Sequence, residues 1–188
     1  MQRLIFDTSI TIKVGEVNFY MDKFLEWLKE NKEHYALVDK SYKKVCQKNG
    51  ESIENIQVNT ELATYGDAVL KLAICSILWS EDISKLSEIK KKYEEDENLV
   101  KKIAQYYHLL NYMLYDKTDK PNDYNYEKKS KTKKNGDVVV SKNNNKHKFI
   151  ATAVEACLGA IYLESKSIDV VLEIVNVWKK LIDNSDNN

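Results

Sequence analysis

Two acidic side chains lie inside long apolar stretches of this chain, and their position is the first sign of chemistry. Asp67 lies in the stretch NTELATYGDAVLKLAICSILW (59–79), and Glu155 lies in FIATAVEACLGAIYLE (149–164). A carboxylate in apolar surroundings is unfavourable unless it is paired, hydrogen-bonded or bound to a metal ion. We therefore expect two apolar helices that meet, with Asp67 and Glu155 sharing a divalent metal.

The composition favours a mostly helical domain that would position these two acids. The 188 residues contain only one Pro and five Gly, and no long alternation of apolar and polar residues predicts extended strands. We expect one compact unit of the all-α class with little strand. Apolar periodicity predicts helices over residues 17–31, 32–48, 59–79, 99–114, 149–164 and 167–182.

The charges balance overall but are unevenly distributed. The 29 basic and 29 acidic residues give a net charge of zero, so no whole-protein field would attract a polyanion. Residues 128–148 nevertheless hold one acid and eight lysines: Lys128, Lys129, Lys131, Lys133, Lys134, Lys142, Lys146 and Lys148. This basic stretch belongs to a long excursion over 116–148, which is either a phosphate-binding loop or an insertion in a compositionally biased chain. We interpret the acidic run 94–97 as solvated surface.

Cysteine spacing and hydropathy exclude several classes of protein. Cys46, Cys75 and Cys157 are widely separated and form no CxxC pair, which argues against a zinc knuckle and against a disulfide framework. No basic segment followed by an apolar one opens the chain, and no charge-free apolar run reaches bilayer-spanning length. We expect an intracellular protein, cytoplasmic or nuclear, with no membrane partner.

The two apolar stretches resemble the motifs of the ribonuclease III family. NTELATYGDAVL (59–70) is similar to NERLEFLGDAVL of that family, and ATAVEACLGAIYLE (151–164) is similar to LADAFEALIGAIYLD. LVDKSY (37–42) also looks like the family segment LTHRSY, and residues 97–106 look like its helix NETLAEIA. The resemblance covers about residues 32–181 and implies a helical fold like the ribonuclease III endonuclease domain.

The resemblance also implies a domain organisation. We expect residues 1–31 to form an N-terminal extension with a helix packing on the core. Residues 32–188 would form the nuclease domain, with the basic insertion at about 116–148. We expect no double-stranded-RNA-binding domain in this chain.

The chain departs from the common family pattern at three positions that usually carry acids. Thr60, Ala63 and Thr152 stand there instead, so Asp67 and Glu155 remain as the acids of the site. The active-site motifs resemble those of the Mini-III branch, whose enzymes consist of the nuclease domain alone, more closely, because that branch has Ala and Thr at the positions of Ala63 and Thr152. That branch also has a basic loop before its second motif. The upstream segment resembles the standard ribonuclease III domain.

For the site, the resemblance implies Mg²⁺, with Mn²⁺ as a substitute, held by Asp67 and Glu155 as catalytic carboxylates. Magnesium is often held by only one or two carboxylates and keeps several waters. Asn59 would orient the first acid or its backbone. Thr60 and Thr152 would hold metal-bound waters through their hydroxyls, or else serve in capping and packing.

For function, the resemblance implies an endoribonuclease that cleaves double-stranded RNA to 5′-phosphate and 3′-hydroxyl ends. Lys128, Lys129, Lys131, Lys133, Lys134, Lys146 and Lys148 would contact RNA. A homodimer is implied, with Thr64 at the position where the family places a partner-contacting aromatic and Tyr65 as its replacement. The alternative is a degenerate family member that binds RNA or a ribonucleoprotein without cleavage.

Overall fold

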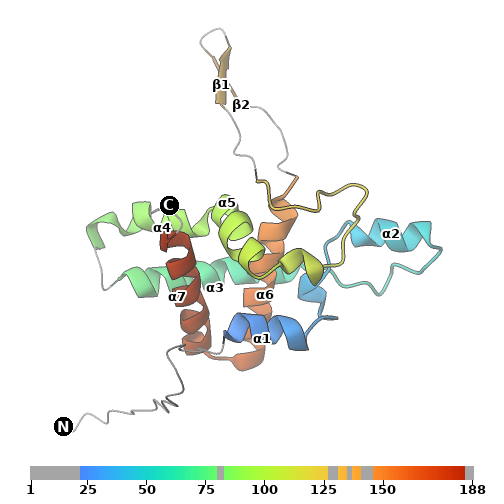
Figure 1. The fold of residues 1–188 in the computed structure, drawn as a ribbon, viewed down its shortest axis with the longest axis horizontal. Coiled ribbons are helices and arrows are strands. Elements are labelled where there is room, and N and C mark those ends of the chain that lie inside the picture. The colour runs from blue at the N-terminus through green and yellow to red at the C-terminus, as the bar shows by residue number, and fades with distance from the viewer. Residues whose placement is uncertain (1–21, 80–82, 127–130, 135–136, 141–145, 185–188) are drawn as a thin grey trace, which may run out of the picture.

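The computed structural model describes residues 22–79, 83–126, 131–134, 137–140 and 146–184. These residues form a mostly helical molecule with one short hairpin, which confirms the predicted all-α class (Figure 1). Its helices are α1 (Lys23–Glu30), α2 (Tyr42–Lys48), α3 (Thr60–Leu78), α4 (Leu86–Glu94), α5 (Asp96–Asn98), α6 (Lys148–Ser165) and α7 (Ile168–Asn184). Short 3₁₀ turns cover Tyr35–Leu37, Ile83–Lys85 and Leu109–Asn111, and a π-helical segment covers Leu99–Ala104.

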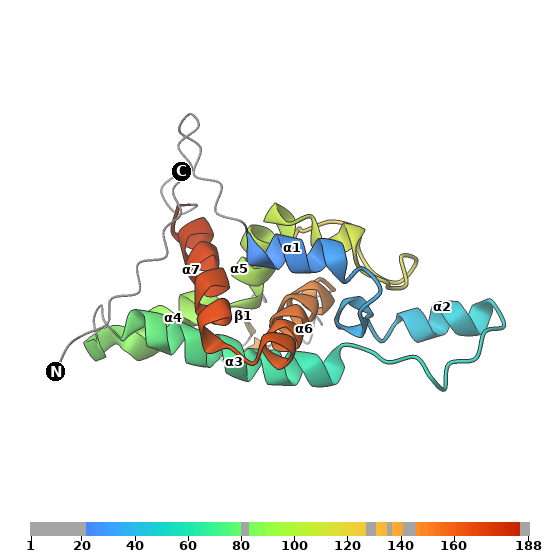
Figure 2. The same cartoon turned by 90° about the horizontal axis from the view of Figure 1, so that it is seen from below.

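The crossing of α3 and α6 is the centre of the fold, and two glycines make it close. Both views show α6 running across α3 (Figures 1 and 2). A Cβ atom on Gly66 would lie 1.8 Å from the carbonyl oxygen of Glu155, and one on Gly159 would lie 2.6 Å from that of Leu62. No side chain fits between backbones at these distances, so glycine is required on both helices.

Helix α7 packs against both α3 and α6, and α1 packs against α7. The ring of Phe24 in α1 packs edge-on against Trp178 in α7, with ring centroids 5.1 Å apart. Trp27 donates from Nε1 to Glu164 Oε2 at 2.7 Å, which ties α1 to the end of α6. The sequence predicted a helix over 17–31; α1 occupies 23–30, and residues before 22 lie outside the described part of the chain.

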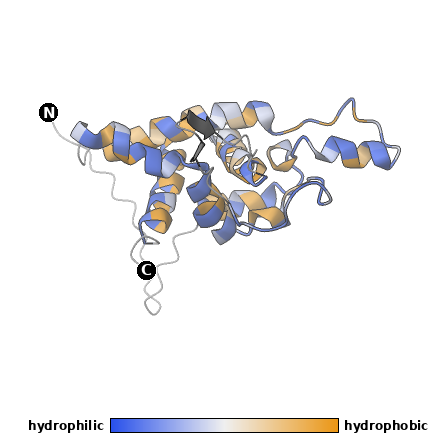
Figure 3. Cartoon of the chain, turned by 90° about the horizontal axis from the view of Figure 1, so that it is seen from above, coloured by the Kyte–Doolittle hydropathy of each residue, from blue (hydrophilic) through white to orange (hydrophobic). Residues whose placement is uncertain are grey.

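The prediction of a helix over residues 32–48 is wrong for the first half of that range. The 3₁₀ turn at Tyr35–Leu37 is followed by an extended segment, and only α2 is α-helical. Asp39 N donates to Leu114 O and Leu114 N donates to Leu37 O, both at 2.9 Å. Because these backbone groups bond to a distant part of the chain, they are not available for a helix. Helix α2 projects from the helical body and is mostly hydrophilic (Figures 1 and 3).

The helix predicted over 99–114 also ends early. After the π-helical segment the chain stays helical only to Tyr106. It then turns at His108, which has a left-handed backbone with φ of 51°. Beyond this turn the backbone N–H of Leu110 donates to the Tyr124 hydroxyl at 3.0 Å. The break directs residues 109–115 back toward the segment before α2.

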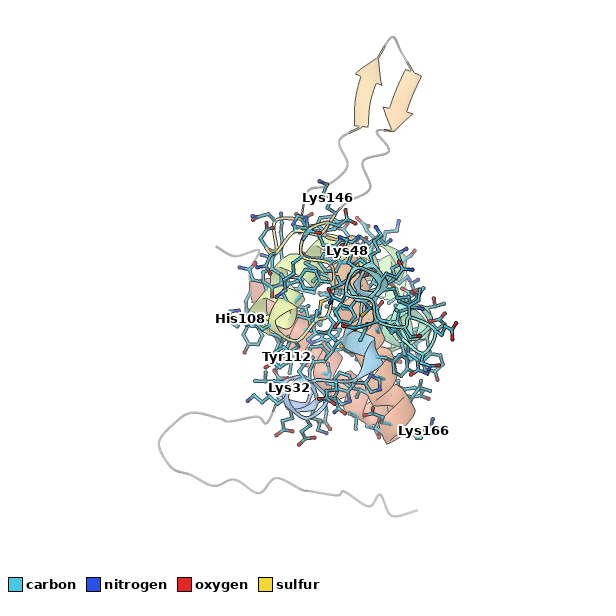
Figure 4. All side chains as sticks on the ribbon, turned by 90° about the vertical axis from the view of Figure 1, so that its right-hand side faces the viewer. Lys32, Lys48, His108, Tyr112, Lys146 and Lys166 are labelled. Carbon is cyan, nitrogen blue, oxygen red and sulfur yellow. The ribbon has the colours of Figure 1, made fainter. Side chains whose placement is uncertain are left out.

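The 116–148 excursion contains an antiparallel hairpin of β1 (Lys131–Lys134) and β2 (Asp137–Val140), with Lys131 opposite Val140. Figure 1 shows this hairpin standing away from the helices. Lys146 lies at the hairpin end of α6 and Lys166 at its opposite end (Figure 4). No helix of the described residues is long and apolar enough to cross a membrane.

Candidate active site at the α3–α6 crossing

Asp67 follows the glycine that brings α3 against α6, so its carboxylate lies at the crossing. The sequence predicted a buried acid, but the Asp67 side chain is 39% exposed. Its Oδ2 accepts a hydrogen bond of 2.6 Å from Nζ of Lys71, one turn further along α3. Asp67 is therefore a carboxylate open to solvent on one side and paired with an ammonium group on the other.

Glu155 comes to the same place from α6 and is the more buried of the two acids. Its backbone carbonyl faces Gly66, the residue before Asp67. Burial raises the pKa of Glu155 to about 7, and the negative charges of Asp67 and Asp96 add to the rise, while Lys148 and Lys71 oppose it. The fold thus brings Asp67 and Glu155 within electrostatic reach of each other, and the metal ion that they would share stays a prediction.

Asp96 is a third acid at this site, and sequence reasoning missed it. It is the first residue of α5, and its charge acts on Glu155. Its Oδ2 lies 3.5 Å from Nζ of Lys148 and accepts a hydrogen bond of 3.4 Å from the Tyr126 hydroxyl. The interpretation of run 94–97 as solvated surface fails for three of its four acids, because only Glu95 is exposed and the side chains of Glu94, Asp96 and Glu97 are partly buried. Nothing within the run distinguishes Asp96 from its neighbours.

The supporting polar residues lie near the crossing with different surroundings. Asn59 is buried at the start of α3, makes no side-chain cap bond, and its Nδ2 has no hydrogen-bond partner in the described part of the chain. Thr60 is exposed in the first turn. The Thr152 hydroxyl donates to the carbonyl of Lys148 at 3.1 Å, a bond within its own helix. Water-holding by Thr60 and Thr152 stays a prediction.

The donor set suits a magnesium ion held by two carboxylates. The described residues contain no group of three or more His, Cys, Asp or Glu side chains that could hold a metal. Repulsion from Asp67 nevertheless contributes to the raised pKa of Glu155, and a cation near both acids would relieve it. Carboxylate oxygens are the ligands that Mg²⁺ prefers, with water completing its shell.

The predicted RNA-binding lysines are divided between the hairpin and α6. Lys131, Lys133 and Lys134 belong to β1. Lys148 is 68% exposed at the start of α6, beside Asp96, and Lys146 is exposed just before that helix. Lys128 and Lys129 lie outside the described residues.

An exposed apolar stripe runs along α3. Tyr65, Leu72 and Trp79 are 40%, 56% and 61% exposed and recur every seven residues, which places them on one side of the helix. The Tyr65 ring lies 6.0 Å from that of Tyr162 in α6, whereas the Thr64 hydroxyl donates to the Thr60 carbonyl within α3. We call Tyr65, Leu72 and Trp79 the α3 stripe.

Comparison with known families links this geometry to a recognised domain. The family model described as Ribonuclease III domain matches residues 60–166, which is more than half of the chain. The matched segment begins with α3 and ends just after α6, so it contains both helices of the crossing. No curated protein matched the chain significantly.

Proposed function

The chain belongs to the ribonuclease III family, and from this premise we propose that it is a magnesium-dependent endoribonuclease cleaving double-stranded RNA. The products would carry 5′-phosphate and 3′-hydroxyl ends, in RNA processing or small-RNA production. The observation that carries the proposal is the approach of Asp67 and Glu155 where α3 crosses α6.

Asp67 and Glu155 are the residues that would hold the metal ion, Mg²⁺ or Mn²⁺ in its place. A bound ion would supply Lewis-acid chemistry, which would activate water for attack on phosphorus and stabilise charge on the leaving oxygen. The backbone of Glu155 is fixed at the helix crossing, whereas the exposed part of the Asp67 side chain leaves access for a phosphate. Asp96 forms an ion pair with Lys148, with Oδ2 3.5 Å from Nζ, and both charges act on Glu155.

Lysines near the hairpin and at the start of α6 would bind the RNA backbone. Lys131, Lys133, Lys134, Lys146 and Lys148 support this role by their number and, for the last two, by their exposure. A-form RNA hides its base edges in a deep groove, so recognition would rest on shape, phosphates and 2′-hydroxyls. Salt should weaken such binding steeply.

A homodimer would bring two such sites together through the α3 stripe. Exposed apolar side chains in a row along one helix are typical of a surface that another chain covers. The stripe includes Tyr65, the residue that we expected to replace the usual family aromatic. Thr64, which bonds within its own helix, contributes less to such a contact.

Cleavage of a long RNA duplex in magnesium tests the proposal directly. Wild-type protein should cut the duplex, while Asp67→Asn and Glu155→Gln should each reduce the rate by at least about a hundredfold, because each removes a charged ligand of the metal. Glu61→Gln is the matched control, since it removes an exposed acid from the same helix. Absence of cleavage by the wild type, or equal rates for all four proteins, would refute catalysis.

A second candidate function is RNA binding without cleavage. It is favoured by the lack, among the described residues, of a group of three or more potential metal ligands. Under this alternative, duplex RNA binds wild type and both acid variants equally well, with or without magnesium. Retention of RNA binding by a wild-type protein that does not cleave would establish it.

A further inference from the structure

Lys71 places a positive charge in the candidate active site. It lies one turn after Asp67 on α3, and its Nζ donates to Asp67 Oδ2 at 2.6 Å. The hydrogen bond to Asp67 raises the pKa of Lys71, with the charges of Asp67, Glu94 and Glu155 acting in the same direction, so the amine is a full ammonium. Its side chain is 45% exposed, which leaves the charged end accessible to a ligand.

Position distinguishes this pair from other ion pairs of the same spacing. Lys101 and Glu97 are also four residues apart, with Nζ 2.9 Å from Oε1. Such pairs on a helix surface usually contribute little to stability. The partner of Lys71, however, is one of the two carboxylates proposed to bind the metal, and the ammonium also acts on the other, Glu155.

The charges that meet at Glu155 favour a single divalent ion. Together with Glu155 they are the carboxylates of Asp67 and Asp96 and the ammonium groups of Lys71 and Lys148. With a cation bound, Glu155 is ionised, and these five groups then leave one net negative charge. Glu94, which also acts on Lys71, is balanced by its own ion pair with Lys90 at 2.7 Å. One divalent ion and one RNA phosphate would bring the site to neutrality, whereas a second divalent ion would add two uncompensated positive charges beside Lys71.

We propose that Lys71 supplies the second positive charge of this site in place of a second metal ion and contacts the RNA phosphate that is cleaved. The inference rests on the proposed nuclease function. An ammonium group binds phosphate as a point charge, so it can stabilise negative charge that builds up on the phosphate oxygens. Each chain then binds one divalent ion, and Lys71 is a catalytic residue.

Mn²⁺ binding measured by isothermal titration calorimetry tests this charge balance without relying on activity. The wild type should bind one Mn²⁺ per chain. Lys71→Met should bind Mn²⁺ about tenfold more tightly, or take up a second ion, because Asp67 loses its competing cation. Lys101→Met is the matched control and should behave as the wild type. Duplex cleavage at saturating Mn²⁺ should fall at least about a hundredfold in Lys71→Met, with partial rescue in Lys71→Arg.

The outcomes separate this inference from the proposed function. One Mn²⁺ bound with the same affinity by wild type and Lys71→Met, or two bound by the wild type, would overturn the role of Lys71 while leaving the nuclease intact. Absence of Mn²⁺ binding by every protein would overturn both. Full cleavage activity in Lys71→Met would also refute the contact with the phosphate.

Discussion

At the scale of single residues, the site has few acids, and each one is shaped by a different environment. Asp67 is half-exposed and paired with Lys71, whereas burial and two neighbouring carboxylates raise the pKa of Glu155 to about 7. Asp96 is tied to Lys148 and Tyr126. Because Thr60, Ala63 and Thr152 carry no acid, the proposed metal affinity would depend on Asp67 and Glu155.

Restoring one acid should therefore strengthen metal binding. Thr152 lies three residues before Glu155 on α6, so the two side chains share one side of that helix. In Thr152→Asp we expect the dissociation constant for Mn²⁺ to fall about tenfold, since an added carboxylate increases the charge that attracts the cation. Calorimetric titration of metal-free protein measures this change.

The control for this prediction is Ser76→Asp, which adds the same charge at an exposed position of α3. Ser76 lies more than two turns beyond Asp67 on α3, and its hydroxyl donates to the Leu72 carbonyl. Its Mn²⁺ affinity should stay close to that of the wild type. Equal tightening in both variants would show that net charge, not the position of residue 152, is responsible.

At the scale of elements, the crossing of α3 and α6 holds the helices that carry Asp67 and Glu155, and it depends on Gly66. In Gly66→Ala the new methyl group would meet the Glu155 carbonyl oxygen, so the helices must separate. We expect the free energy of unfolding to fall by at least about 3 kcal/mol, at the upper end of overpacking effects because backbone atoms obstruct the methyl group. Urea denaturation followed by circular dichroism measures it.

Gly50→Ala is the comparison for that experiment. A Cβ atom on Gly50 meets nothing within 4 Å, but the residue has a positive φ of 77°. We expect a loss of about 1 kcal/mol, which reflects the left-handed backbone alone. A Gly66→Ala protein as stable as Gly50→Ala would contradict the close crossing.

The hydrogen bonds of Asp183, which connect α7 to α4, predict that the stability of the fold depends on pH. Asp183 accepts hydrogen bonds from Lys92 at 2.8 Å, Tyr93 at 2.9 Å and Lys179 at 3.0 Å. Partial burial alone would raise the pKa of Asp183, but these bonds outweigh it and hold the pKa below its ordinary value of 3.8.

A carboxyl whose pKa is lower in the folded state stabilises the protein above its unfolded pKa, and this stabilisation is lost as the pH falls through the folded pKa. At about pH 6, wild type should therefore exceed Asp183→Asn by roughly 1 kcal/mol in free energy of unfolding, a modest value because the site is one-third exposed. The difference should shrink toward about pH 3. A constant difference across this range would show that Asp183 is not stabilised by its charge.

At the scale of the whole molecule, the α3 stripe predicts association of two chains. The stripe extends over about 21 Å, since fourteen residues of helix separate its ends. In Leu72→Glu a charge would enter the proposed contact, so we expect the dimer mass to fall to the 21.9 kDa of one chain. Sedimentation equilibrium measures the mass. Leu114→Glu, at another exposed apolar residue, should remain dimeric.

The sequence by itself determined the features that depend on local pattern. Composition predicted the all-α class, and two apolar runs predicted α3 and α6 to within a residue or two of their ends. The same runs contained Asp67 and Glu155 and the motifs of the ribonuclease III family. These features are readable because helical propensity and burial act over neighbouring residues.

Only the tertiary structure decided the features that depend on residues far apart in the chain. Leu37 and Asp39 bond to Leu114 instead of continuing into an α-helix, because backbone groups from a distant segment reach them. Asp96 became a site residue because α5 begins beside Glu155. The spacing of Asp67 and Lys71 is visible in the sequence, but their position next to Glu155 is not. It arises where Gly66 and Gly159 let two helices touch.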